Sequence, residues 1–259
     1  MSAFIHPTAI VNPNAKIGEH CHIGAYCIVG ENVTLAEKVR LDSHVVIDGK
    51  TFIGAETHVF PFVSIGLAPQ DLKFKGEETA VEIGARNQIR EFVTIHRGTL
   101  GGGGLTKLGN DNLLMAQAHV AHDCQLGNDI IMANAATLAG HVEIADRANV
   151  GAYSGVHQFC RVGLEAFVGG YSVVVKDAPP FAIIQGNHAK CYGLNKVGMK
   201  RRGYSKETLE NLQHAYRLLL SSKLNTTQAV EKIREDIFDC KEVEILLNFI
   251  ETSKRGIVK

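Results

Sequence analysis

The chain has 259 residues, 45% of them apolar and 21% charged, and its formal net charge at pH 7 is zero because 27 Lys and Arg residues balance 27 Asp and Glu residues. This composition excludes an intrinsically disordered chain and argues against a protein that binds nucleic acid through a large positive charge. The length suits one or two domains.

The N-terminal part of the chain has an aliphatic residue at every sixth position. A period of six fits neither a helix of 3.6 residues per turn nor a two-residue alternation, so each hexad is expected to hold one short strand and one turn. Three hexads would close a triangular coil, and coils must stack at about 4.8 Å because one hexad buries too little alone. The series has eleven members: Ile5, Val11, Ile17, Ile23, Val29, Leu35, Leu41, Ile47, Ile53, Val59 and Ile65.

The hexads are interrupted twice. The polar stretch 66–82 has no aliphatic residue in register and predicts a loop that projects from the coils. Register returns at Ile83, but four consecutive glycines at 101–104 interrupt it again. The hexads restart one residue out of phase at Leu108 and continue to Val174. Loops that leave a rigid solenoid often carry function, whereas we interpret the glycine run as a tolerated insertion.

Beyond the repeats the sequence predicts three helices. A helical pattern begins at Ser205, and Asn225 with Gln228 forms a capping box before a second apolar stripe. Apolar residues between Val243 and Ile250 predict the third helix.

The hexads end at Pro179 and Pro180. We therefore expect two domains, a mainly β parallel β-helix over 1–187 and a small α-helical domain over 188–259. The open end of a solenoid exposes unpaired strand groups and apolar side chains, so the helical domain is expected to cover it.

Membrane, secretory and disulfide signals are missing from the sequence. No stretch approaches the roughly 18 apolar residues of a membrane span, and the N-terminus lacks the charged start and apolar run of a signal peptide, so we expect a cytoplasmic protein. No CxxC pair supports a zinc knuckle or a disulfide framework. Four of the six cysteines occupy the small-residue position of the hexad and are expected to fill the core: Cys21, Cys27, Cys124 and Cys160.

The segment HVAHDC concentrates titratable groups. It places His119, His122 and Asp123 within five residues. Histidine titrates near neutrality, so His122 could act as a general base toward a hydroxyl while Asp123 orients its ring. The chain has twelve histidines, and a lone exposed one usually has no catalytic role. A cluster aligned by the coils is a stronger signal.

Coil stacking predicts what lies beside this segment. Adding eighteen to 122 gives Gly140, and eighteen more gives Gln158, so His122, Gly140 and Gln158 should form one column at steps of about 5 Å, with His141 next to Gly140. The Gly140 N–H could stabilise the oxyanion that forms when an alkoxide attacks a thioester carbonyl.

Charged groups outside this cluster give two further candidates. Asp71 and Lys73 in the projecting loop offer a hydroxyl acceptor and an anion contact, unless they only solvate the loop. A basic run near the helical domain favours an anionic partner, either a nucleotide pyrophosphate or an acidic carrier protein, over a merely solvated face. Aromatic residues are sparse there, which argues against nucleic acid. The run comprises Lys196, Lys200, Arg201, Arg202 and Lys206.

Six motifs, spread over essentially the whole chain, resemble those of the UDP-N-acetylglucosamine O-acyltransferases. The resemblance implies a left-handed parallel β-helix of hexapeptide repeats. It also implies transfer of an (R)-3-hydroxyacyl group from acyl carrier protein to the 3-hydroxyl of UDP-N-acetylglucosamine, the first step of lipid A biosynthesis in Gram-negative bacteria. The motifs are HVAHDC at 119–124, AGHV at 139–142, APQDLK at 68–73, GVHQF at 155–159, QGNHA at 185–189 and GLNKVGMKRRG at 193–203.

The resemblance also implies a role for each candidate residue. His122 would be the general base, supported by Asp123, and the Gly140 N–H would be the oxyanion donor. Gly170 would gauge acyl length, and a glycine there leaves room for a chain of about fourteen carbons. The implied substrate contacts are Asp71, Lys73, His119, His141 and Gln158, with Asn195, Arg201 and Arg202 near the nucleotide and its phosphates.

The family is homotrimeric with active sites between subunits. It implies no metal and no cofactor beyond the phosphopantetheine that carries the acyl donor on acyl carrier protein. One departure is Lys196-Val197, which stands where related sequences often carry an acidic residue near the nucleotide.

Three alternatives remain at this point. A later N-acyltransferase of the same pathway would carry a separate N-terminal uridine-binding domain, but the repeats begin at Ile5. A zinc hydratase of the γ-carbonic anhydrase type would need a histidine pair five residues apart, which is missing. A non-catalytic β-helix, either a scaffold or an ice-binding surface, would not need His122, and ice binding would need flat threonine columns that are missing.

Overall fold

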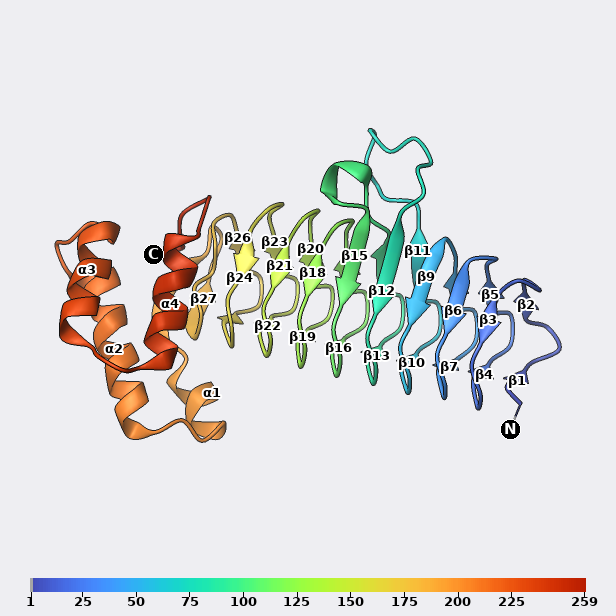
Figure 1. Cartoon of the computed structure of the whole chain (residues 1–259), viewed down its shortest axis with the longest axis horizontal. Coiled ribbons are helices and arrows are strands. Elements are labelled where there is room, and N and C mark those ends of the chain that lie inside the picture. The colour runs from blue at the N-terminus through green and yellow to red at the C-terminus, as the bar shows by residue number, and fades with distance from the viewer. Residues whose placement is uncertain (1) are drawn as a thin grey trace.

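The computed structural model describes residues 2–259 and shows a left-handed parallel β-helix with helices at its C-terminal end (Figure 1). Within these residues three sheets form the faces of a triangular prism. Sheet A contains, in spatial order, β1 (Phe4–Ile5), β4 (His22–Ile23), β7 (Arg40–Leu41), β10 (His58–Val59), β13 (Gln88–Ile89), β16 (Leu113–Leu114), β19 (Ile131–Met132), β22 (Asn149–Val150), β25 (Phe167–Val168), β27 (Ala182–Gln185) and β28 (Lys190–Leu194). Its last pair, β27 and β28, is antiparallel.

The other two faces contain only parallel pairs. Sheet B contains β2 (Ile10–Val11), β5 (Ile28–Val29), β8 (Val46–Ile47), β11 (Ser64–Leu67), β14 (Thr94–His96), β17 (His119–Val120), β20 (Thr137–Leu138), β23 (Gly155–Val156) and β26 (Val173–Val174). Sheet C contains β3 (Lys16–Ile17), β6 (Val33–Leu35), β9 (Lys50–Ile53), β12 (Ala80–Ile83), β15 (Leu105–Leu108), β18 (Gln125–Leu126), β21 (Glu143–Ile144) and β24 (Arg161–Val162).

Strand register confirms the eighteen-residue coil predicted from the hexads. His119 lies opposite Thr137, and Thr137 lies opposite Gly155. Where the sequence breaks register, the coils are longer, since Ser64 lies opposite Thr94 and Thr94 lies opposite His119. The insertions therefore leave the stacking of the strands intact.

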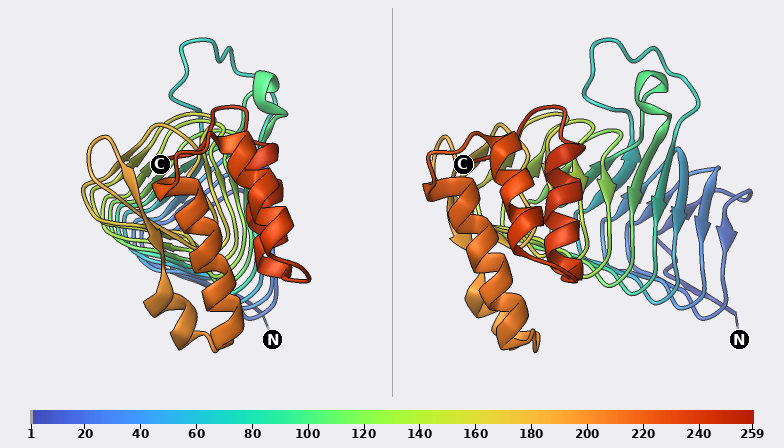
Figure 2. Two further views of the ribbon diagram at one scale, coloured as in Figure 1. Left: turned by 90° about the vertical axis from the view of Figure 1, so that its left-hand side faces the viewer. Right: turned by 60° about the vertical axis from the view of Figure 1, so that its left-hand side comes forward.

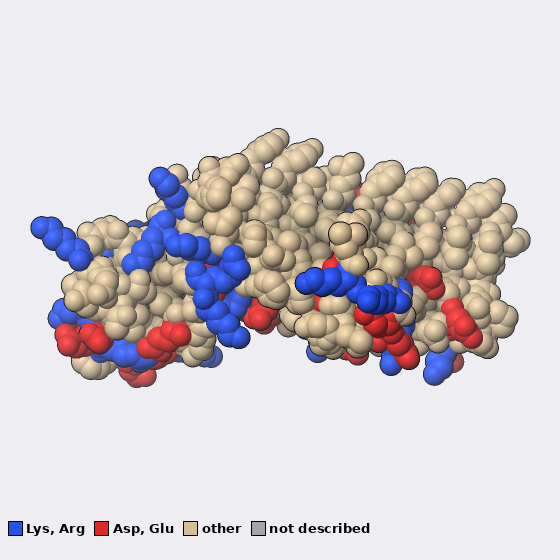
Figure 3. All heavy atoms as spheres, turned by 90° about the horizontal axis from the view of Figure 1, so that it is seen from above, with Lys and Arg blue, Asp and Glu red and all other residues tan. Residues whose placement is uncertain are grey.

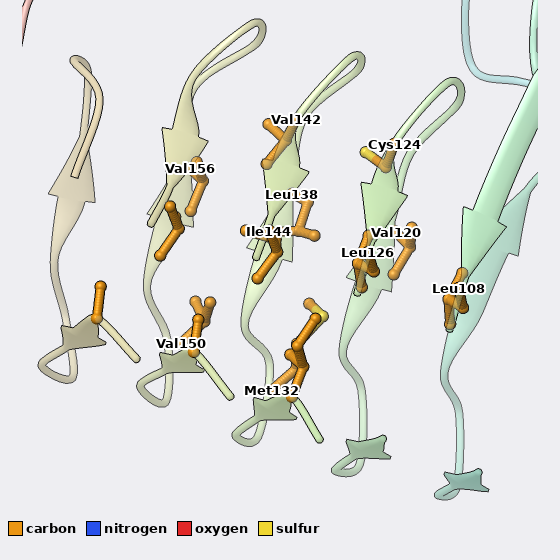
Figure 4. Close-up of a cluster of buried hydrophobic side chains, with 14 of the residues drawn as sticks. Leu108, Val120, Cys124, Leu126, Met132, Leu138, Val142, Ile144, Val150 and Val156 are labelled. Carbon is orange, nitrogen blue, oxygen red and sulfur yellow. The ribbon is translucent and has the colours of Figure 1, made fainter. Parts of the chain in front are cut away.

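The aliphatic column fills the prism. Figure 4 shows side chains of this column pointing inward from successive coils, among them Leu108, Val120, Leu126 and Leu138. Burial of each such side chain contributes roughly 1.5–3 kcal/mol. The four cysteines expected as core fillers, Cys21, Cys27, Cys124 and Cys160, are all buried, as predicted.

Two loops leave the prism on the same side (Figures 1 and 2). Loop 1 covers residues 68–79, between β11 and β12, so the expected bounds of 66–82 were too wide. The reason is that residues 80–83 pair with β9 and β15 and continue the ladder. Loop 2 covers residues 97–104, between β14 and β15, and contains the 3-10 helix η1 (Leu100–Gly102).

Four helices follow the coils: α1 (Lys196–Arg201), α2 (Lys206–Ser221), α3 (Thr226–Asp236) and α4 (Lys241–Glu251). The helix starts predicted at Ser205 and at the Asn225–Gln228 capping box are confirmed, because both side chains accept hydrogen bonds from backbone N–H groups of the next turn. The helix predicted between Val243 and Ile250 is α4.

The helices lie against the end of the β-helix, as expected. Helix α2 contacts strand β28, and Figure 2 shows α2 and α4 in front of the coils when the prism is viewed end on. The expected domain boundary at 187/188 falls in the turn between β27 and β28. Throughout residues 2–259, no helix has both the length and the apolar character needed to cross a bilayer.

Candidate active site

His122 and Asp123 form a hydrogen-bonded pair at a corner between sheets B and C. The Nδ1 of His122 lies 2.8 Å from Oδ2 of Asp123. The Asp123 carboxylate has no exposed surface, whereas the His122 side chain is 15% exposed. A carboxylate at Nδ1 favours the tautomer with its proton on that nitrogen. The Nε2 lone pair of the neutral ring is then free to accept a proton.

The corner backbone sets the direction of the carboxylate. Asp123 has a φ of +60°, and the stacked corner residues His141 and Phe159 have φ values of +61° and +62°. The left-handed region disfavours most L-residues, but short polar side chains such as Asp tolerate it better. The Asp123 N–H donates to the Thr106 hydroxyl at 2.8 Å, which fixes the corner against strand β15.

Gly140 lies directly against the His122 ring. The N–H of His141 donates to the His122 carbonyl, and the N–H of Phe159 donates to the Gly140 carbonyl, so the predicted stacking of 122, 140 and 158 is confirmed. Within residues 2–259 the Gly140 N–H has no hydrogen-bond acceptor. Gln158 is exposed at the end of this column. The column therefore presents an imidazole, an unpaired N–H and an amide on one strip.

Two further histidines adjoin the pair. The rings of His122 and His141 meet edge to face with centroids 5.1 Å apart, and His141 stacks on Phe159 at 4.4 Å. Burial lowers the pKa of His141, although the nearby Asp123 opposes that effect. The Nδ1 of His119 and the Thr94 hydroxyl form a hydrogen bond of 2.7 Å. Burial lowers the pKa of His119, and the charge of His122 lowers it further.

His96 belongs to this cluster but was missed by the sequence analysis. Its ring meets His119 edge to face at 5.2 Å, and its buried Nδ1 has no hydrogen-bond partner. Burial, then the charges of His119 and His122, lowers the pKa of His96 to about 4. The available signal was its place directly after the aliphatic Ile95 and before the second break in register.

Loop 1 reaches toward the cluster. Asp71 is half-buried, and its charge acts on His141 by opposing the lowering of that pKa. The Asp71 side chain accepts from the N–H of Lys73 at 2.9 Å, whereas the Lys73 side chain is exposed. The Arg97 guanidinium at the start of loop 2 lies 5.2 Å from the Phe74 ring. This contact joins loop 1 to loop 2.

Loop 2 covers the carboxylate of Asp123. A side chain at Gly102 would overlap that carboxylate, whereas a Cβ at Gly101 would meet no atom within 4 Å. The glycine run, which the sequence analysis interpreted as a tolerated insertion, therefore packs against the pair. The run contacts the pair because the insertion folds back over the corner instead of projecting freely.

A groove of about 320 Å³ adjoins the pair. Asp123, His141 and Phe159 line one part of it, and the basic side chains of Arg161, Lys254 and Arg255 line another. Figure 3, viewed from the side of the loops, shows Lys and Arg gathered over the helical end and on the loops, with few charged groups on the coils between them. Glu143 and Asp177 line it as well, and Asp177 lies 3.0 Å from the Arg161 guanidinium, so the groove offers groups of both charges beside the Phe159 ring.

Asn195 and Arg201 lie elsewhere, around a second cavity of about 450 Å³. Phe167 and Ile183 of sheet A form its apolar wall. The Asn195 side chain caps α1 by accepting from the Gly198 N–H at 3.0 Å. The cavity is lined by sheet A and by residues 195–202, whereas the histidines extend from sheet B and its corner with sheet C.

Arg202 lines the same cavity but is already engaged. Its Nη1 lies 3.0 Å from the buried carboxylate of Glu165, which also lies 2.9 Å from the Arg147 guanidinium and accepts from the Tyr204 hydroxyl. The Arg202 guanidinium also donates to the Arg147 carbonyl. Arg202 thus anchors the helical domain to the prism.

Gly170 lies at the corner between sheets A and B. It is exposed, and a Cβ there would lie 3.3 Å from the Ala152 carbonyl oxygen. The next residue, Tyr171, stacks on Tyr153 at the same corner. One chain therefore places Gly170 and His122 at different corners of the prism.

His122, Asp123 and His141 are also the group of possible metal ligands among the described residues, with ligand atoms within 4.8 Å of one another. Both carboxylate oxygens of Asp123 already accept hydrogen bonds, from loop 2 and from the His122 ring. With these hydrogen bonds, His122, Asp123 and His141 are arranged for proton transfer.

Comparisons with known proteins agree on one family. The family model described as UDP-N-acetylglucosamine O-acyltransferase, domain 2, matches residues 177–258. LpxA from Acinetobacter baumannii has 45% identity and a TM-score of 0.97, with 99% of this chain and 100% of that chain covered. LpxA from Bacteroides fragilis, a UDP-N-acetylglucosamine acyltransferase, has 41% identity, a TM-score of 0.97 and the same coverage. The Arabidopsis UDP-N-acetylglucosamine acyltransferase has 32% identity and a TM-score of 0.86, again with 99% and 100% covered.

Proposed function

Because the chain belongs to the UDP-N-acetylglucosamine O-acyltransferases and is thus an O-acyltransferase of lipid A biosynthesis, we propose that it transfers an (R)-3-hydroxyacyl group from acyl carrier protein to the 3-hydroxyl of UDP-N-acetylglucosamine. The observation that carries this proposal is the column formed by the His122 ring and the unpaired Gly140 N–H. It offers a base and an oxyanion donor at adjacent rungs.

His122 is the general base in this proposal. Its Nε2 takes the proton of the sugar 3-hydroxyl as the oxygen attacks the thioester carbonyl carbon. Asp123 accepts from Nδ1–H throughout, so it holds the ring in place and stabilises the imidazolium. The proton on Nε2 then passes to the leaving thiolate when the tetrahedral intermediate collapses. Proton transfer of this kind typically contributes about 10²–10⁴ in rate.

Gly140 has two roles. Its N–H is proposed to donate to the oxyanion of the tetrahedral intermediate, and removal of one such donor typically costs about 10²–10³ in kcat. Because residue 140 has no side chain, the His122 ring can also pack directly against its backbone.

The remaining polar residues are proposed to bind substrate. Around the dyad of His122 and Asp123 these are Asp71, Lys73, His119, His141 and Gln158. Around the second cavity they are Asn195, Arg201 and Arg202. Arg201 is the better candidate for the nucleotide phosphates, because it is exposed while Arg202 is held by Glu165.

A homotrimer with active sites between subunits follows from the same proposal. In one chain the dyad lies at the corner of sheets B and C, whereas Gly170 and the Asn195 cavity lie on sheet A and its corner with sheet B. Two copies side by side would bring these surfaces together across one cleft. The separation within one chain supports this arrangement.

Gly170 is proposed to gauge the acyl chain. It is exposed on the prism, so a larger side chain would project into the cleft and shorten the pocket. A glycine there favours a chain of about fourteen carbons.

The proposed reaction needs no metal and no cofactor of the enzyme, since the acyl donor is carried on the phosphopantetheine of acyl carrier protein. A cytoplasmic location is proposed on the same basis, because a nucleotide sugar and an acyl carrier protein are both cytoplasmic substrates. Neither nucleic acid nor a membrane span has a part in it.

The test is to incubate the purified protein with UDP-N-acetylglucosamine and a panel of 3-hydroxyacyl carrier proteins, and to read product masses. We expect an O-acylated nucleotide sugar with a maximum near fourteen carbons, and loss of product in His122→Ala. Full transfer by His122→Ala would contradict the general base. No transfer together with bound zinc in a metal content analysis would favour a hydratase, and no transfer without zinc would favour a scaffold.

A further inference from the structure

Thr99 of loop 2 makes two hydrogen bonds to the carboxylate of Asp123. Its N–H donates to Oδ1 at 2.9 Å, and its hydroxyl donates to Oδ2 at 2.7 Å. Thr99 is itself buried, and the carboxylate has no exposed surface. Both oxygens of Asp123 are therefore satisfied by one residue of an inserted loop, with no water needed.

The Thr99 hydroxyl and the His122 ring share one oxygen, Oδ2. A buried carboxylate that accepted only from His122 would be free to rotate about its Cβ–Cγ bond. Two donors from Thr99 remove this freedom and hold Oδ2 against the His122 ring.

Gly102 presses the loop against the same group. A Cβ at residue 102 would overlap Cγ and both oxygens of Asp123, so the loop backbone touches the carboxylate directly. The turn is closed by backbone hydrogen bonds, since the N–H groups of Gly102 and Gly104 both donate to the Thr99 carbonyl. Gly102 thus lets the loop backbone approach Asp123 closely enough to deliver the Thr99 donors.

We propose that Thr99 is a positioning residue that, held by the Gly102 turn, fixes the Asp123 carboxylate for proton transfer by His122. This deepens the proposed acyl transfer and rests on it. Thr99 does not touch substrate in this scheme. Its effect reaches the reaction only through the Asp123 and His122 pair.

Two matched pairs of variants test the proposal in the full-length enzyme. Thr99→Val is compared with Thr57→Val, which also removes a buried hydroxyl, in this case one that donates to the Gly84 carbonyl at the corner between sheets C and A. Gly102→Ala is compared with Gly101→Ala, whose new methyl group would meet no atom within 4 Å.

We expect Thr99→Val and Gly102→Ala to lower kcat by about 10–100-fold, because misplacement of a catalytic group costs that much. The KM for UDP-N-acetylglucosamine should stay within about twofold, and the acid limb of the pH–rate profile should move. Thr99→Ser, which keeps both donors, should restore kcat. Thr57→Val and Gly101→Ala should react like the wild type.

A double-variant cycle separates positioning from a general loss of structure. In an Asp123→Ala background, Thr99→Val should change kcat no further, because its target is gone. Additive losses, or a kcat of Thr99→Val equal to that of Thr57→Val, would overturn the proposal. An inactive wild-type enzyme would instead contradict the proposed function.

Discussion

The His122 ring packs against the Cα of Gly140 in the next coil so closely that a methyl group on residue 140 would lie 2.5 Å from Cε1 and 2.7 Å from Nε2 of the ring. The imidazole and the backbone N–H that are proposed to act together are therefore neighbours only because residue 140 has no side chain. Stacking of eighteen-residue coils brings them together, and the glycine sets the fit.

Gly140→Ala is expected to lower kcat by at least about 100-fold, because the new methyl group displaces the His122 ring from its hydrogen bond with Asp123. Thermal stability should fall only slightly, since the ring is partly exposed. Steady-state transfer assays with 3-hydroxyacyl carrier protein measure the effect. Gly155→Ala is the matched control, because a Cβ at that strand residue meets no atom within 4 Å. Equal activity of the two variants would refute this reading of the packing.

Mixed trimers test the shared site. His122→Ala and Arg201→Ala homotrimers are each expected to be nearly inactive. After the two variants are unfolded and refolded together in equal amounts, about a quarter of the sites combine an intact His122 with an intact Arg201 of the neighbour. Recovery of that fraction of wild-type activity supports a site between subunits. If mixing restored nothing, both residues would have to act within one chain.

Glu165→Leu is expected to destabilise the fold by about 3 kcal/mol, since it leaves Arg147 and Arg202 without their buried partner. Urea unfolding followed by circular dichroism measures the loss. Glu56→Leu is the comparison, because its pair with Lys38 is exposed on both sides and such pairs contribute about 0–1 kcal/mol. Similar losses in the two variants would show that Glu165 does not anchor the helical domain.

Because His96 is buried, the free energy of unfolding should fall as the pH becomes acidic. Its pKa is about 4 in the folded protein and about 6.5 when unfolded, so between those values only the unfolded chain takes up the proton. The free energy of unfolding should drop by up to about 3 kcal/mol as pH falls from 7 to 4. In His96→Phe this part of the drop should vanish. Parallel pH curves for wild type and variant would contradict a neutral buried ring.

Much of this architecture follows from local sequence. The six-residue aliphatic period determined the coils, their eighteen-residue register and the buried cysteines, because one hexad can only be stable when its neighbours stack on it. The same arithmetic placed Gly140 beside His122. Caps at Ser205 and Asn225 determined helix starts, since their partners are only a few residues away.

The contacts of the inserted loops depended on the tertiary structure. No periodic rule relates Thr99 or Gly102 to Asp123, because the insertion breaks the register that links one coil to the next. For the same reason the sequence analysis missed His96 and did not predict the contacts of the glycine run. The pairing of Arg202 with Glu165 likewise depends on how the helical domain docks on the prism. That docking is decided by the burial and charge of residues that lie far apart in the sequence. Sequence alone thus determined which coils stack, and the folded chain decided which loop closes over the corner that holds His122 and Asp123.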